Sequence, residues 1–208
     1  MKRIIVLLSA IFCIYSISGC AVGHKYNYSS AWPSLSFSSG KKITIAVHDQ
    51  RAYVLNGQKS DNYVGMVRAL AGNPWDVITD NEQPLSNIMA NNICDGLNNS
   101  GIKAEKVLTK YTDSKTNILN NMAMTSKDSD RLIVFTVLEW YTDTYRNTAL
   151  YAHLIVEVYD KDKNNISKFE FKEEKDLGNG KAYSTGPNAF KDIISTILNK
   201  PEIKSSII

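Results

Sequence analysis

Runs of apolar residues with the spacing of β-strands dominate the second half of the chain. A solid apolar run opens residues 131–141, and apolar side chains alternate with others along residues 149–159. A turn near Arg146 and Asn147 joins the two stretches, so the pattern predicts two long strands in an antiparallel ribbon. Alternation continues over residues 166–172, which predicts a third strand beside them.

Helical spacing of apolar residues predicts three amphipathic helices. The first covers residues 84–97 and stops at the polar and glycine-containing residues 98–101, and the second covers residues 117–124. The third has apolar residues at one-turn and two-turn spacing, with Pro187 in its first turn and Pro201 as its stop.

Shorter strands are predicted at residues 43–47 and 104–109, on either side of the first helix. Between the first strand and that helix lies an excursion, residues 52–75, which lacks helical spacing and contains the hairpin signal Asn56-Gly57. This order of elements predicts one α+β domain over residues 41–208, in which two to three helices pack against a mixed, largely antiparallel sheet.

The amino terminus has a different pattern, because a basic pair precedes one short apolar run. Lys2 and Arg3 come before the apolar residues 4–17, and small residues follow. This is the three-part layout of an export signal. A membrane-spanning helix would need roughly twenty apolar residues, and the chain turns polar soon after Cys20, so we favour a cleaved signal over a permanent anchor.

Residues 17–20, Ile-Ser-Gly-Cys, resemble the lipobox of bacterial lipoproteins. The resemblance implies that residues 1–19 are removed and that Cys20 receives covalent lipid, with no other cofactor. Two or more acyl chains hold a protein stably on a membrane. Residues 20–40 are rich in Ser and show no periodicity, so we expect a flexible tether that spans about 25 Å.

Charge and cysteine content narrow the classes of function. Residues 1–19 hold two basic and no acidic residues, so their removal changes the balance from 24 basic and 21 acidic residues to 22 and 21. Near neutrality argues against nucleic-acid binding. Cys13 leaves with the signal and Cys20 carries lipid, so we expect no intrachain disulfide and a core position for Cys94.

Polar residues at the end of the first strand form the most site-like cluster. His48, Asp49 and Arg51 follow a buried strand, a position that often lines a crevice. No nucleophile motif, paired metal-ligand spacing or phosphate loop accompanies them. We therefore expect no enzyme and no metal, and a structural or partner-binding role for the cluster; a hydrolase centred on His48 and Asp49 is the weakest hypothesis.

The excursion carries residue types that are enriched at protein interfaces. These are Tyr53, Tyr63, Met66, Arg68 and Trp75. The hypothesis is that they contact a partner. The equally weighted alternative is that they fold back and cover the sheet.

The layout from residue 43 to residue 201 resembles the YajG-like lipoproteins and the auxiliary lipoproteins of ABC-type lipid transport systems. The lipobox, the Ser-rich segment, the long antiparallel strands and the final helix carry this resemblance. Short matches to uncharacterised bacterial lipoproteins are Asp49-Gln50-Arg51, Tyr53-Val54 and Gly72-Asn73-Pro74.

This resemblance implies adaptors, not enzymes. We therefore expect a membrane-anchored periplasmic adaptor or accessory subunit that binds an envelope protein, and the alternative is a carrier of lipid or a small amphiphile. Ala21 stands where an Asp favours retention at the inner membrane in the resembled lipoproteins. The expected location is thus the periplasmic side of the outer membrane.

Overall fold

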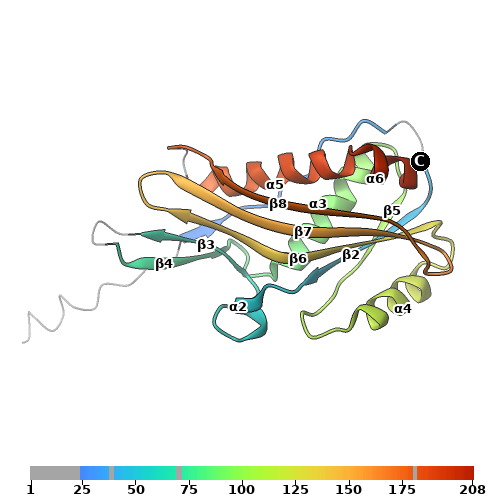
Figure 1. Cartoon of the computed structure of the whole chain (residues 1–208), viewed down its shortest axis with the longest axis horizontal. Helices are drawn as coiled ribbons and strands as arrows, with labels where there is room; N and C mark the ends of the chain where they lie inside the picture. Colours follow the sequence, from blue (N-terminus) through green and yellow to red (C-terminus); the bar gives the residue numbers. More distant parts are fainter. Residues whose placement is uncertain (1–23, 38–39, 69–71, 180–181) are drawn as a thin grey trace, which may run out of the picture.

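Eight strands form one mixed β-sheet, with helices on both of its faces (Figure 1). The computed structural model describes residues 24–37, 40–68, 72–179 and 182–208. The strands are β1 (His24–Tyr26), β2 (Ile43–Asp49), β3 (Tyr63–Arg68), β4 (Pro74–Thr79), β5 (Ala104–Val107), β6 (Arg131–Thr144), β7 (Thr148–Asp160) and β8 (Asn165–Asp176). The helices are α2 (Ala52–Leu55), α3 (Leu85–Asn99), α4 (Lys115–Thr125), α5 (Ala182–Leu198) and α6 (Pro201–Ile207). The predicted α+β class is confirmed.

Strand β6 pairs with three other strands of the sheet. One of its edges pairs antiparallel with β7, and β8 pairs with the far edge of β7. Its other edge is shared, because β2 pairs with residues 131–137 and β3 with residues 142–144, both in parallel. The predicted antiparallel ribbon is confirmed. The shared edge leaves a short gap between β2 and β3, and this gap shapes the candidate site.

Two apolar clusters lie on opposite faces of the sheet. The larger one packs α3, α5 and α6 against strand residues such as Phe135 and Val156, and it includes Cys94 as predicted. The smaller one packs Ile118 and Met122 of α4 against the other face. Figure 1 shows α5 and α6 above the sheet and α3 behind its strands, with α2 and α4 apart from each other below it. One face is therefore covered by three helices and the other only in part.

Residues 24–37 belong to the folded domain, which corrects the flexible tether expected over residues 20–40. Strand β1 pairs in parallel with β4, and Tyr26 and Tyr28 are fully buried. Ala31 and Phe37 are buried as well, so apolar side chains at irregular spacing anchor this Ser-rich segment. Cys20, the signal at residues 1–19 and the remaining tether residues lie outside the described residues.

Three local predictions are also corrected. The excursion contains the short helix α2, and Asn56-Gly57 ends this helix with Gly57 at φ 69° instead of forming a hairpin. The hairpin of this region is β3–β4. Helix α5 begins before Pro187, and Pro201 opens α6, since proline is tolerated at a first position that needs no N–H. The described helices therefore exceed the expected two to three.

Candidate functional site

Asp49 and Arg51 form a buried ion pair just past the end of β2. Arg51 Nε lies 2.8 Å from Asp49 Oδ1, and Arg51 Nη2 lies 2.7 Å from Asp49 Oδ2. Arg51 is 0% exposed and Asp49 is 2% exposed. Burial lowers the pKa of Arg51, but the hydrogen bonds and charge of Asp49 outweigh it and raise that pKa above its ordinary value. Arg51 is thus charged, and both oxygens of the Asp49 carboxyl group contact its guanidinium.

The guanidinium of Arg51 also donates hydrogen bonds to three backbone carbonyls, two in the excursion and one in β6. Nη2 donates to Asp61 O at 2.9 Å, while Nη1 donates to Tyr63 O and, at 3.3 Å, to Trp140 O. Tyr53 Oη donates to the same Trp140 carbonyl at 3.1 Å. Trp140 lies in the gap on the edge of β6 where no strand pairs. Arg51 and Tyr53 therefore replace the missing strand partner and hold the excursion against the sheet.

His48 lies beside Gln50 at the end of β2. It is 6% exposed, and its Nε2 lies 2.8 Å from the amide nitrogen of Gln50, which also donates to Tyr111 O. Burial lowers the pKa of His48, which favours the neutral imidazole. Among the described residues, no group of His, Cys, Asp and Glu side chains could hold a metal ion. The first predicted cluster thus consists of buried groups that stabilise the loop after β2.

Four tyrosines form a continuous row from the excursion onto the partly covered face of the sheet. The rings of Tyr53 and Tyr63 meet edge to face at 5.5 Å, and those of Tyr53 and Tyr141 at 6.1 Å. Tyr141 stacks on its cross-strand neighbour Tyr151 at 4.7 Å. Tyr63 is buried, and the other three are half-buried. Such aromatic pairs add stability beyond the area that they bury.

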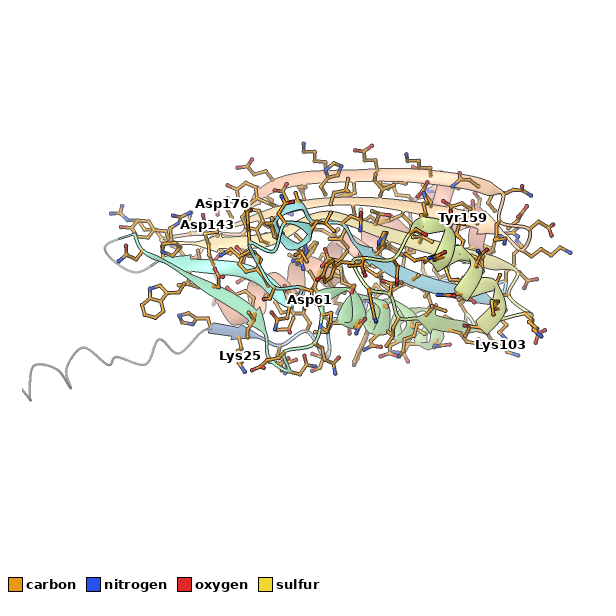
Figure 2. All side chains as sticks on the ribbon, turned by 90° about the horizontal axis from the view of Figure 1, so that it is seen from below. Lys25, Asp61, Lys103, Asp143, Tyr159 and Asp176 are labelled. Atoms are coloured by element: carbon orange, nitrogen blue, oxygen red, sulfur yellow. The ribbon has the colours of Figure 1, made fainter. Side chains whose placement is uncertain are left out.

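Charged side chains border this row. Arg68 Nε donates to Asp143 Oδ1 at 2.8 Å, and His153 Nε2 lies 2.7 Å from Glu170 Oε1. Figure 2 views this side of the molecule, with Asp143 near the end of the sheet. We call this surface, which lies beside α2 on the side away from α4, the open face. It is defined by Arg68, Glu139, Tyr141, Asp143, Tyr151 and His153.

The predicted contact residues therefore divide into three groups. His48, Asp49, Arg51 and Tyr63 are buried beneath the surface, whereas Tyr53 and Arg68 border the open face. Met66 lies beside Arg68 with its sulfur 3.4 Å from Nη2, and Trp75 is 39% exposed on β4. Sequence reasoning missed Tyr141. Its only signal is that side chains alternate between the two faces of the sheet along two strands that were predicted to pair.

The tyrosine row predicts a loss of stability at alkaline pH. Burial raises the pKa of Tyr53, Tyr63 and Tyr141, that of Tyr141 to about 12, and the hydrogen bond with Glu174 raises that of Tyr151. An unfolded phenol ionises near pH 10, so above that pH the unfolded chain loses protons that the folded chain keeps. The contribution is complete below about pH 10 and is lost as the pH rises toward the folded pKa values.

We therefore expect the free energy of unfolding, measured with urea, to fall between about pH 10 and about pH 12. Tyr141→Phe keeps the ring but removes one ionisable group, so its decrease should be shallower. An unfolding free energy that stays constant to about pH 11 would contradict the prediction.

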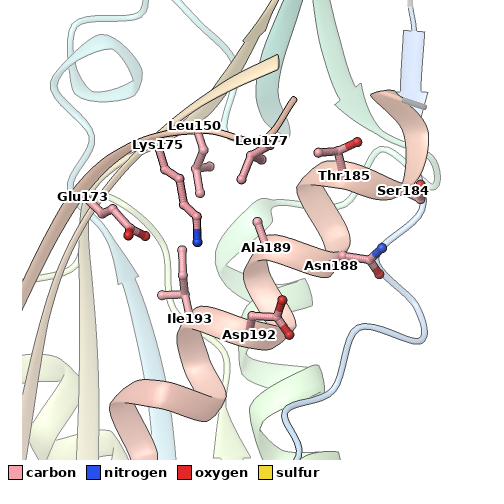
Figure 3. A pocket seen from close by; sticks show the side chains of 10 residues that line it. All are labelled: Leu150, Glu173, Lys175, Leu177, Ser184, Thr185, Asn188, Ala189, Asp192 and Ile193. Atoms are coloured by element: carbon pink, nitrogen blue, oxygen red, sulfur yellow. The ribbon is translucent and has the colours of Figure 1, made fainter. Parts of the chain in front are cut away.

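A cavity of about 270 Å³ lies between β8 and the first part of α5 (Figure 3). Leu150 and Ile193 form part of its apolar wall, and Glu173, Lys175 and Asp192 also border it. Pockets for small molecules measure roughly 300–1,000 Å³. This cavity is thus at the small end for a lipid or amphiphile and is partly lined by charges.

The comparisons with known proteins found a similar fold but no matching family. No protein-family model matches the sequence, and no curated protein matches it. Protein XCC0632 from Xanthomonas campestris, of the family DUF330, is similar in structure with a TM-score of 0.51 at 12% identity, over 88% of this chain and 93% of that chain. At this identity the likeness supports a shared fold alone.

Two further solved structures are more distant. Lipoprotein GNA1162 from Neisseria meningitidis aligns with a TM-score of 0.33 at 11% identity, over 77% of this chain and 96% of that chain. The PelC dodecamer from Paraburkholderia phytofirmans aligns with a TM-score of 0.41 at 12% identity, over 80% and 90%. Within the described ranges, no helix is long and apolar enough to cross a bilayer.

Proposed function

We propose that this chain is a lipid-anchored protein of the bacterial envelope that acts as a non-catalytic adaptor. The lipobox at residues 17–20 supports the anchor, with Cys20 as the lipidated residue. Ala21 supports placement at the outer membrane, facing the periplasm. The partner is another envelope protein, which is held near the membrane by the anchor.

The open face carries this proposal. It exposes half-buried tyrosines beside α2, while three helices cover the opposite face of the same sheet. Half-buried aromatic side chains bordered by charges of both signs are the composition of a protein-binding surface. The partner that fits it is a protein surface of mixed charge that can pack against Tyr141 and Tyr151. The small, partly charged cavity beside α5 gives less support to a carrier of lipid or amphiphile.

Site-specific crosslinking in intact cells tests the adaptor. A photoreactive residue at position 153, on the open face, should capture one protein in stoichiometric yield. Tyr141→Ala should weaken that capture about tenfold or more, because truncating an aromatic anchor at the centre of an interface costs 2 kcal/mol or more. Tyr111→Ala is the control, since Tyr111 is 38% exposed but lies outside the open face.

The anchor is tested in the same cells. Cys20→Ala should abolish the incorporation of labelled palmitate, leave a larger precursor and release the protein from the membrane fraction. Equal capture in Tyr141→Ala and the parent would argue against the open face as the contact surface. Native mass spectrometry that finds a co-purifying lipid at full occupancy would favour the carrier instead.

A further inference from the structure

One end of the sheet gathers four chain segments. Arg68 and Pro74 pair at the tip of the β3–β4 hairpin, and Val67 pairs with Thr144 at the end of β6. The β6–β7 turn, residues 145–147, and the last residue of β8, Asp176, lie at the same end. Figure 1 shows this end on the left. We call it the hairpin end.

The described chain also begins at the hairpin end. His24 pairs with Val77 of β4, only three positions after Pro74, and β1 runs from there in the direction of β4, away from the tip. Farther along, Ser34 N donates to Ser195 Oγ at 2.8 Å, near the far end of α5. Because β1 is fixed by pairing and by the buried Tyr26, the position of His24 is fixed in the domain.

This placement limits how far Cys20 can lie from the domain. Four residue steps separate Cys20 from His24, and an extended chain covers at most about 3.6 Å per residue, or about 14 Å in total. The sequence pattern alone had suggested a tether of about 25 Å. A lipid on Cys20 therefore holds the hairpin end within reach of the membrane surface.

The hairpin end exposes the residue types that favour the membrane interface. Trp75 is 39% exposed and Tyr145 is 51% exposed, and the guanidinium of Arg146 lies 6.0 Å from the ring of Tyr145. Tryptophan and tyrosine concentrate at the level of the lipid headgroups, and arginine reaches phosphates there.

Three aspartates near this end have compensating contacts. Asp143 pairs with Arg68, and Asp76 pairs with Lys59. Asp176 accepts hydrogen bonds from Asn147 and from the N–H of Gly178. Contact with an anionic headgroup layer is thus less opposed than the acidic residues alone would suggest.

We propose that the hairpin end lies against the headgroup layer of the membrane that holds Cys20, with Trp75 and Tyr145 in the interface. This inference rests on the lipidation in the proposed function. In this orientation the strands run roughly perpendicular to the membrane, and their ends at the hairpin end contact the headgroup layer. The open face looks sideways into the periplasm, where a partner anchored in the same membrane can approach it.

The three tryptophans of the chain allow a direct test. Trp32 is 41% exposed but borders Gly96 and Asn99 at the C-terminal end of α3, away from the hairpin end, while Trp140 is fully buried. The full-length lipidated protein is reconstituted into vesicles of phosphatidylethanolamine and phosphatidylglycerol whose acyl chains are brominated near the headgroup. Bromine quenches tryptophan fluorescence only at short range.

Brominated vesicles should quench part of the tryptophan fluorescence of the parent and of Trp32→Phe. In Trp75→Phe most of this quenching should be absent. Trp32→Phe is the matched control, since Trp32 and Trp75 are 41% and 39% exposed. Vesicle flotation of the parent and of Cys20→Ala reports the anchor separately. Floating protein whose Trp75 is not quenched overturns the orientation and leaves the anchor intact; a parent that does not float overturns both.

A second copy of the chain could cover the hairpin end instead of lipid. In that case the emission of Trp75 in detergent without phospholipid would shift to shorter wavelength as the protein concentration rises. That result would also overturn the orientation, and emission that is independent of concentration supports it.

Discussion

Replacing Arg51 by alanine is expected to lower the free energy of unfolding by about 3–5 kcal/mol, the cost of breaking a buried ion pair by removing one partner. The substitution leaves the carboxylate of Asp49, which is 2% exposed, without its cation. It also takes a donor from the carbonyls of Asp61, Tyr63 and Trp140. Urea unfolding followed by circular dichroism measures the change.

The matched control is Arg68→Ala. Arg68 also pairs with an aspartate, but its side chain is 37% exposed and that of Asp143 is 21% exposed, so water can replace the lost contacts. We expect a cost of about 1 kcal/mol or less there. Equal costs for the two variants would show that Arg51 is not needed to close the gap on β6. The pair Asp49→Asn with Arg51→Met should recover part of the loss, because it removes both charges together.

The ribbon and the helices could be predicted because their signals are local. The apolar alternation of β6 and β7 and the helical spacing of α3 and α5 are each contained within one element. Such a pattern shows directly which face of the element is buried against the core. Leu150, Leu154 and Val156 all lie in the core, on the face that the alternation indicated.

The packing of residues 24–37 could not be predicted for the opposite reason. Its anchors have no period, because a segment without regular structure follows the surface that it covers. Tyr28 is held through its backbone carbonyl, which accepts a hydrogen bond from Asn92 at 2.8 Å, and Pro33 packs on Gly96. A Cβ on Gly96 would lie 2.5 Å from the Pro33 ring. The absence of a side chain at this position therefore allows a segment distant in sequence to pack directly on α3.

The cluster at the end of β2 could be found from the sequence, and a structural role was one of its two expected roles. His48 and Asp49 are the last two residues of this buried strand, and Arg51 follows it. Their burial arises because β2 and β3 leave β6 unpaired around Trp140, and no local pattern encodes that gap. The open face was missed in part, because Tyr141 and Tyr151 meet only through the register of β6 against β7.

The orientation on the membrane and the open face constrain each other. The strands point their ends at the bilayer if the hairpin end rests on it, so Tyr141 and Tyr151 lie along a wall that is roughly perpendicular to the membrane. An adaptor with this geometry binds a neighbour in the same membrane more readily than a partner across the periplasm. If Cys20 carries the proposed lipid, the short distance from Cys20 to His24 limits how the domain is oriented on the membrane.

The second large effect is expected at Gly65, where β3 meets β6. A Cβ at this position would lie 2.3 Å from Thr142 Oγ1 and 2.7 Å from the Thr142 carbonyl oxygen. The register of β3 shifts between Tyr63 and Gly65, so the glycine marks a bulge where the two backbones approach closely. Gly65→Ala should therefore cost about 3 kcal/mol, the upper part of the range for overpacking a rigid site.

A double-mutant cycle with Thr142→Ala separates the two clashes. Thr142 Oγ1 is buried and has no hydrogen-bond partner in the described structure, so its removal alone should change the free energy of unfolding by less than about 1 kcal/mol. In the double variant the side-chain clash is gone, but the carbonyl oxygen remains 2.7 Å from the new Cβ. About half of the loss should then return. Complete rescue would mean that the side chain of Thr142 alone requires the glycine, and no rescue would mean that the backbone contact alone sets the distance between β3 and β6.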